Sequence, residues 1–271
     1  MTLKDIGPVV LVGAGKMGLA LARGWIAGGL PPASLVLCDP NASGAARQFA
    51  NEHGVRLLAS PLGVLTHVLV LAVKPQVIYD VMAEIQPVVG AHTLVLSIAA
   101  GISIAGLSAA LNTERVIRTM PNTPAQVGRG ITGAVGLNVS AVDHETADAL
   151  LAAAGEVVWF EAESALDAVT AVSGSGPAYV FYMVEALALA GMRQGLEPEE
   201  AMQLARATVV GAAALMDQDP LPAAQLRENV TSPKGTTAAA LAVLMAPDGL
   251  AELLDRAVDA ARRRSEELGR G

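Results

Sequence analysis

The chain has 271 residues, of which 52% are apolar and only 16% are charged, and its formal net charge is -8. A chain of this length can bury a full core and form two domains. Its three Phe, three Tyr and two Trp are too few for base-stacking platforms, so we expect no nucleic-acid partner. The small charged fraction leaves little polar surface for a monomer, which favours an oligomer with helices buried on several sides.

The cysteine content and the N-terminal residues further limit the class of protein and the compartment that we expect. One cysteine, Cys38, excludes an intramolecular disulfide and a cysteine-rich metal site, and we expect no bound metal. The first eight residues lack the basic region and cleavage site of a signal peptide. The longest uncharged span, 85–113, contains proline and glycine and is predicted as a strand, a loop and a short helix. We therefore expect a cytoplasmic protein that does not associate with membranes.

Short apolar runs alternate with helical segments through residues 1–164. The run at 9–12 predicts a strand, and the periodicity of 16–27 predicts a helix closed by two glycines. Further strands are expected at 35–38, 68–73, 93–98, 115–118, 131–137 and 157–160, with a helix over 43–53. This alternation predicts an α/β fold, a Rossmann-type doubly wound parallel sheet with helices on both faces.

From residue 165 onward the strand signals vanish. Helices are expected over 178–193, from 197 onward, and over 222–229, 237–245 and 248–268. The predicted domains are therefore a dinucleotide-binding domain, 1–164, and an all-α substrate-binding and dimerisation domain, 165–271. The segment 179–190 is apolar on every face except at Glu185, which predicts a homodimer with interlocked helical halves.

The sequence Gly-Ala-Gly-Lys-Met-Gly at 13–18 follows the first strand and opens the first helix. Glycines in this spacing allow a tight turn, a close approach to a pyrophosphate and close helix packing. The second predicted strand ends at Asp39, where an acid would bind the ribose hydroxyls of NAD. Asn41 and Arg47 offer donors for the 2′-phosphate of NADP, so both cofactors stay open. The predicted cofactor-binding residues are Gly13, Ala14, Gly15, Lys16, Met17, Gly18, Asp39, Asn41, Ala72, Val73, Lys74, Pro75, Ala99 and Ala100.

The residue inventory of the helical half favours reduction of a C=N bond over a C=O bond. All four histidines lie in the first half, and Lys234 is the only lysine of the second. A carbonyl reductase normally needs an acid for the developing alkoxide, whereas a protonated imine already carries its charge. The stretch 229–237, N-V-T-S-P-K-G-T-T, holds four hydroxyls and opens a helix, with Thr236 or Thr237 expected as the N-cap. Backbone N–H groups at such a helix start can hold a carboxylate.

Two motifs of the second half, S-G-S-G-P-A-Y at 173–179 and N-V-T-S-P-K-G-T-T at 229–237, resemble those of pyrroline-5-carboxylate reductases. The segments at 72–75 (A-V-K-P) and 116–124 (V-I-R-T-M-P-N-T-P), and G-L-x-P-E-x-A from Gly195, support the resemblance, which runs end to end. It implies NAD(P)H-dependent hydride transfer to 1-pyrroline-5-carboxylate, giving L-proline in the last step of proline biosynthesis. It also implies homodimers, in some members assembled into larger rings.

The resemblance also assigns site residues. Thr237 would be the catalytic hydroxyl, bonded to the ring nitrogen, and the backbone of Lys234, Gly235 and Thr236 would hold the carboxylate, with Ser232 nearby. Glu163 would lie at the mouth of the site and Ser175 at the bend between the domains, within reach of cofactor or substrate. Met120 and Asn122 would border the nicotinamide, and Ser60 completes the cofactor set. Two positions depart from the family pattern: Lys234 stands where a glycine is common, and Asp39-Pro40-Asn41 replaces residues often seen with NADPH.

Other functions are weighed against the same residues. An imine reductase with another substrate has the same architecture and stays the nearest alternative. A β-hydroxyacid dehydrogenase needs a lysine acid on the first long interdomain helix, and 177–193 contains none. A non-catalytic dinucleotide sensor could keep the glycine motif but would have no need for the hydroxyl-rich loop.

Overall fold

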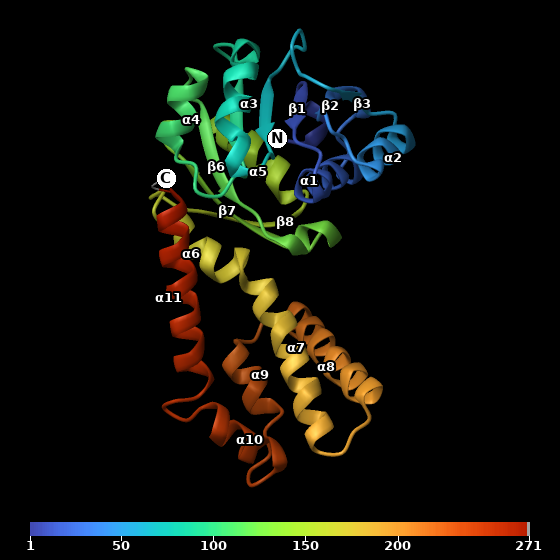
Figure 1. The fold of residues 1–271 in the computed structure, drawn as a ribbon, viewed down its shortest axis with the longest axis vertical. Coiled ribbons are helices and arrows are strands. Elements are labelled where there is room, and N and C mark those ends of the chain that lie inside the picture. The colour runs from blue at the N-terminus through green and yellow to red at the C-terminus, as the bar shows by residue number, and fades with distance from the viewer. Residues whose placement is uncertain (270–271) are drawn as a thin grey trace. The chain divides into compact units, whose positions relative to one another are not determined.

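The structure, a computed structural model, describes residues 1–269 (Figure 1). It forms two compact units, which are described separately below. The first contains Met1–Ser175 together with residues 261–269, and the second contains Gly176–Ala260. This division differs from the composition change at residue 165, because residues 165–169 pack on strands of the first unit and Ser265, near the end of the chain, is bonded to Asp167. The domain boundary after residue 164 stays a prediction.

An eight-stranded sheet organises the first unit, with the strand order β3-β2-β1-β4-β5-β6-β7-β8. The strands are β1 (Val9–Val12), β2 (Leu35–Cys38), β3 (Arg56–Leu58), β4 (Val68–Leu71), β5 (Leu94–Ser97), β6 (Val116–Met120), β7 (Gly130–Gly136) and β8 (Gly155–Trp159). The strands from β3 to β6 in this order are parallel; β7 is antiparallel to β6, and β8 is parallel to β7. The predicted doubly wound sheet is confirmed, and β3 is a strand that the sequence did not predict.

Helices cover both faces of this sheet, as the alternation predicted. The helices are α1 (Lys16–Ala27), α2 (Gly44–His53) and α5 (Ala141–Ala152) on one face, and α3 (Ile78–Ile85), α4 (Ile104–Leu111) and α6 (Ala165–Val169) on the other. Side chains of β1 alternate between the two cores: Val9 and Leu11 face the first group of helices, and Val10 and Val12 face the second. Figure 1 shows α3 and α4 side by side on the second face. The central strands are thus buried on both faces, as is usual for parallel sheets.

Short helical turns connect these elements. Turns of 3-10 helix lie at Leu3–Asp5, Pro32–Ser34, Pro75–Val77, Gln86–Val88 and Thr123–Val127, and a π-helical turn lies at Thr170–Gly174. The π-helical turn overlaps the start of the predicted S-G-S-G-P bend at 173–174, and Ser175 separates it from α7 (Gly176–Arg193). Such turns are rare and frequently occur at functional sites.

The second unit is entirely helical. It contains α7 (Gly176–Arg193), α8 (Pro198–Gln218), α9 (Ala223–Asn229), α10 (Thr236–Leu244) and the first part of α11 (Leu250–Gly269). The helices α7 and α8 pack together, and the buried residues of 176–260 are limited to Ala188, Ala201 and Ala205. Large apolar side chains of α7 stay exposed, among them Phe181 at 64%. A unit with so small a core needs further apolar surface to cover it.

Two negative findings apply to residues 1–269. No helix in that range is long and apolar enough to cross a membrane. Within the same range, no group of three or more His, Cys, Asp or Glu side chains could hold a metal ion.

Candidate cofactor and substrate sites

The predicted cofactor residues of the first unit gather at one edge of the sheet. The strands β1 to β6 run in the same direction, so their carboxyl ends meet at that edge. The residues that follow these ends are Gly13 after β1, Asp39 after β2, Ser60 after β3, Ala72 after β4, Ala99 and Ala100 after β5, and Asn122 after β6. Strand β1 lies between β2 and β4, which makes it the point where the strand order reverses. Open α/β sheets bind ligands outside the carboxyl ends of the strands at this point.

The glycine-rich loop fits a dinucleotide pyrophosphate. Gly13 has a φ of +98°, and a Cβ there would lie 2.6 Å from the carbonyl oxygen of Ala72. A Cβ on Gly18 would lie 2.3 Å from the carbonyl oxygen of Gly13. Both glycines are therefore required by the protein's own packing. Gly15 differs, since a Cβ there would meet nothing within 4 Å and its φ of -76° is ordinary. The glycine at position 15 is explained by a ligand that approaches the backbone at the start of α1.

The carboxylate of Asp39 is held against this loop. Its Oδ2 accepts a hydrogen bond from the Ala14 N–H at 2.9 Å, and its Oδ1 accepts one from the Asn41 N–H at 2.8 Å. These two bonds fix the carboxylate beside the glycine-rich turn, where the sequence predicted it. The preceding residue, Cys38, is buried, and its desolvation raises the pKa of the thiol to about 11. Cys38 is therefore protonated at neutral pH and is not a nucleophile.

Lys16 and Lys74, both predicted to bind the cofactor, are exposed at this edge. Asn122 is buried, and its side-chain oxygen accepts the N–H of Ile131 at 2.9 Å, so the side chain supports the start of β7. Met120 ends β6, and a Cβ on Gly174 would come within 2.9 Å of its methyl carbon. Contacts of Met120 and Asn122 with a nicotinamide stay predictions.

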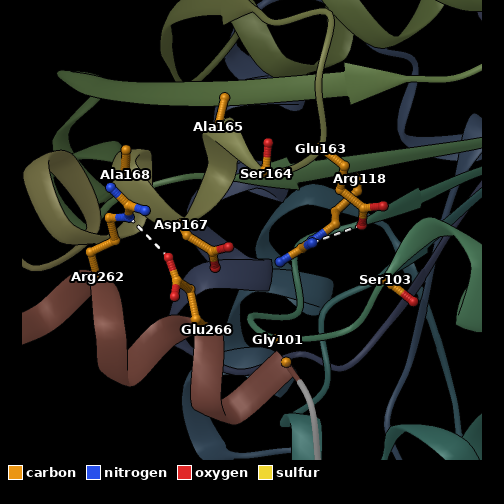
Figure 2. Close-up of a pocket in the computed structure, with 11 residues that line it drawn as sticks. Gly101, Ser103, Arg118, Glu163, Ser164, Ala165, Asp167, Ala168, Arg262 and Glu266 are labelled. Carbon is orange, nitrogen blue, oxygen red and sulfur yellow. Dashed lines mark hydrogen bonds and ion pairs between the residues drawn. The ribbon is translucent and has the colours of Figure 1, made fainter.

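Glu163 has protein partners that the sequence did not reveal. Its Oε1 accepts a hydrogen bond from Arg118 Nη1 at 2.7 Å and another from the Ile104 N–H at 2.8 Å. Figure 2 shows Arg118 and Glu163 side by side in the wall of a cavity of about 690 Å³, with the ion pair between them. The signal for Arg118 was available, because a charged residue in the middle of an apolar strand usually has a partner. The partner itself could not be read from the sequence.

Ser175, at the end of the π-helical turn, donates its N–H to the Thr170 carbonyl at 2.8 Å.

The substrate residues predicted at 232–237 form one turn in the second unit. Gly235 is the N-cap of α10, so the prediction that Thr236 or Thr237 caps this helix is wrong: these two residues are its first two members. The Gly235 N–H donates to the Ser232 carbonyl at 3.0 Å and closes the turn. Because Gly235 has no side-chain oxygen, the first N–H groups of α10 keep their capacity to bind an anion. Ser232, Lys234, Thr236 and Thr237 are all exposed within the single chain.

Lys234 adopts a left-handed conformation, with a φ of +60°. Glycine is favoured at such a position, which gives a physical reason for the glycine that the resemblance implies there. The turn keeps its shape with a lysine at some cost in backbone strain. The structure thus places the predicted cofactor residues at one edge of the first unit and the predicted substrate residues at one helix start of the second. A site that joins the two groups stays a prediction.

These features define the first unit as the dinucleotide-binding domain of an oxidoreductase. Residues 8–101 match the family model described as NADP oxidoreductase, coenzyme F420-dependent, and residues 163–268 match that of pyrroline-5-carboxylate reductase dimerisation. The pyrroline-5-carboxylate reductase of Pseudomonas aeruginosa is 40% identical over 264 residues, which cover 96% of each chain. The chain belongs to the pyrroline-5-carboxylate reductase family.

Solved structures agree with this assignment. A pyrroline-5-carboxylate reductase from Coxiella burnetii matches with a TM-score of 0.90 and 34% identity over 97% of this chain and 99% of that one. The pyrroline carboxylate reductase of Plasmodium falciparum, solved with NADP bound, matches with a TM-score of 0.81 and 28% identity over 98% and 99% of the two chains. Both the sheet and the helical half are therefore shared with this family.

Proposed function

We propose that the protein is a pyrroline-5-carboxylate reductase, which reduces the C=N bond of 1-pyrroline-5-carboxylate to give L-proline, the last step of proline biosynthesis. The observation that carries the proposal is the end-to-end match to reductases of this name, which includes both halves of the chain. The chemistry of the residues supports it, since the helical half offers hydroxyls and helix N–H groups but no imidazole.

When bound, the nicotinamide supplies the hydride. The glycine-rich loop and the start of α1 would hold the pyrophosphate, and Asp39 would face the adenosine ribose. The N–H groups at the start of α10 would hold the substrate carboxylate, with Ser232 nearby. Thr237 Oγ would accept the hydrogen bond of the protonated ring nitrogen and so orient the C=N carbon. No acid is needed to protonate the nitrogen during reduction, because the iminium already carries that proton and hydride arrival at carbon neutralises its charge.

Both NADH and NADPH are proposed as cofactors. The Plasmodium falciparum relative was solved with NADP, which supports NADPH. The anchored carboxylate of Asp39 supports NADH, because it would face the ribose hydroxyls and repel a 2′-phosphate.

The second unit is proposed to form a homodimer by covering its apolar faces with those of a second copy. A groove between α7 and α8 is lined by apolar side chains such as Val180, Phe181 and Met202, together with Glu185 and Arg206. In a twofold dimer the groove of one copy meets the same groove of the other. Glu185 and Arg206 of each groove then bring opposite charges to the interface. The matched dimerisation region, 163–268, contains these helices. A larger ring of dimers and a cytoplasmic location stay predictions from the sequence.

The decisive assay follows the loss of NADH or NADPH absorbance on adding 1-pyrroline-5-carboxylate. One parallel reaction contains a six-membered cyclic imine acid with the same reduced cofactors, and another contains a 2-hydroxyacid with NAD+ or NADP+, in which the absorbance would rise. We expect turnover with the five-membered imine to exceed the other two. Faster turnover of the six-membered imine would assign the chain to the imine reductases instead, and oxidation of the hydroxyacid with NAD(P) as the main activity would refute imine reduction.

A further inference from the structure

The cavity of Figure 2 lies wholly within the first unit and has five charged side chains in its wall. All five have partners within that unit. Arg118 pairs with Glu163, Arg262 pairs with Glu266 at 2.9 Å, and Asp167 accepts a hydrogen bond from Ser265 Oγ at 2.7 Å. The charges are thus used to join β6, α4, α6 and the end of α11. This pattern indicates a positioning role for the cavity wall more than a ligand site.

Within this wall, Glu163 Oε1 accepts hydrogen bonds from two elements, α4 and β6. Glu163 lies just before α6, Arg118 lies in the middle of β6, and Ile104 is the first residue of α4. The Ile104 N–H is one of the groups that a helix start leaves without an intrahelical acceptor, and a carboxylate there is favoured by the helix dipole. The Arg118 side chain is 10% exposed, so it needs its anionic partner. Loss of Glu163 would leave both groups without this acceptor.

The loop between β5 and α4 is held at both ends by such contacts. At its start, the Ile98 N–H donates to the Leu71 carbonyl at 3.0 Å. At its end, Ile104 is bonded to Glu163, and Ser103 caps α4 by accepting the Gly106 N–H at 3.1 Å. Between these anchors lie Ala99 and Ala100, at the edge of the sheet where the cofactor is predicted to bind. A shift of the first turn of α4 would therefore move these two residues.

We propose that Glu163 is a positioning residue: paired with Arg118, it holds the β5–α4 loop in the shape that binds the dinucleotide, and it does not act by touching the substrate. This inference rests on the proposed cofactor use of the chain. It replaces the substrate-binding role that the resemblance suggested for the same carboxylate with one that follows from its two observed hydrogen bonds.

The test is equilibrium binding of NADH and NADPH without substrate, together with the substrate KM at saturating cofactor. We expect Glu163→Ala to raise the cofactor Kd about tenfold, equivalent to about 1.4 kcal/mol, with the substrate KM changed by less than about twofold. Glu163→Gln keeps an oxygen for the Ile104 N–H and should raise the Kd by only about threefold. Combining Glu163→Ala with Arg118→Ala should add little to the single change, because both disrupt one pair.

Glu161→Ala is the matched control, since this exposed carboxylate lies two residues away. If Glu163→Ala fails to show cooperative unfolding, Glu163→Gln and Arg118→Lys replace it, and both should raise the cofactor Kd. An unchanged cofactor Kd with a raised substrate KM would overturn the inference in favour of direct substrate contact. Wild-type protein that binds neither NADH nor NADPH would instead refute the proposed function itself.

Discussion

Replacing Asp39 with serine should shift the cofactor preference of the protein toward NADPH. The carboxylate is fixed beside the glycine-rich loop by the N–H groups of Ala14 and Asn41, so it cannot turn away from a 2′-phosphate without losing both bonds. Serine removes the negative charge and leaves a hydroxyl that can donate to the phosphate.

The size of the shift follows from the charge that is removed. Two unit charges about 4 Å apart interact by about 1 kcal/mol in bulk water and about 4 kcal/mol at an effective dielectric constant of 20. Asp39 is only partly buried, so we use the lower part of this range. A change of about 1.4 kcal/mol corresponds to about a tenfold rise in the NADPH-to-NADH ratio of kcat/KM. NADH activity should also fall, because the carboxylate no longer accepts the Ala14 N–H.

The assay is steady-state oxidation of each cofactor at saturating 1-pyrroline-5-carboxylate for wild type and Asp39→Ser. Asp39→Asn separates the two effects, since it removes the charge but keeps one acceptor oxygen, and it should shift the ratio in the same direction. Asp255→Ser, at an exposed position on α11, controls for the change in net charge. A ratio that stays within about twofold of wild type in both Asp39 variants would refute the placement of the carboxylate beside the ribose.

Further predictions concern the helical half and one ion pair of the first unit. Thr237→Ala should lower kcat while the cofactor Kd stays nearly constant; loss of NAD(P)H binding instead would remove its assigned role. Lys234→Gly should leave the substrate KM within about twofold, because the backbone and not the side chain holds the carboxylate, and a large rise would contradict this. Glu185→Ala should weaken the homodimer in light scattering, and an intact dimer with normal activity would count against its interface role. Burial raises the pKa of Asp143, but hydrogen bonds donated to its carboxylate by Arg115 and by Ser140 outweigh burial and lower the pKa overall. The stabilisation by Asp143 is therefore present at neutral pH and lost as the pH falls through that lowered pKa, so Asp143→Asn should lower Tm at pH 7 and have less effect in acid.

Much of the fold and of the cofactor edge could be predicted from the sequence. The apolar run before Gly13, the glycine spacing that follows and Asp39 after the next run are local patterns, and each appears in the structure where it was expected. Strand β3 was missed because three residues, Arg-Leu-Leu, are too short to show a period. The cap of α10 was assigned to a threonine because hydroxyls usually cap helices, whereas here the closed turn places Gly235 at that position.

Local patterns determined the class of fold, the glycine loop and the hydroxyl-rich helix start, because each depends on residues that are neighbours in the chain. Tertiary structure alone decided which strands lie side by side, and it alone paired Glu163 with Arg118, 45 residues away, and with Ile104, 59 residues away. It also brought Ser265 to Asp167 across 98 residues. Such pairs depend on how distant segments pack. The residues next to a buried charge in the sequence do not indicate which distant residue is its partner.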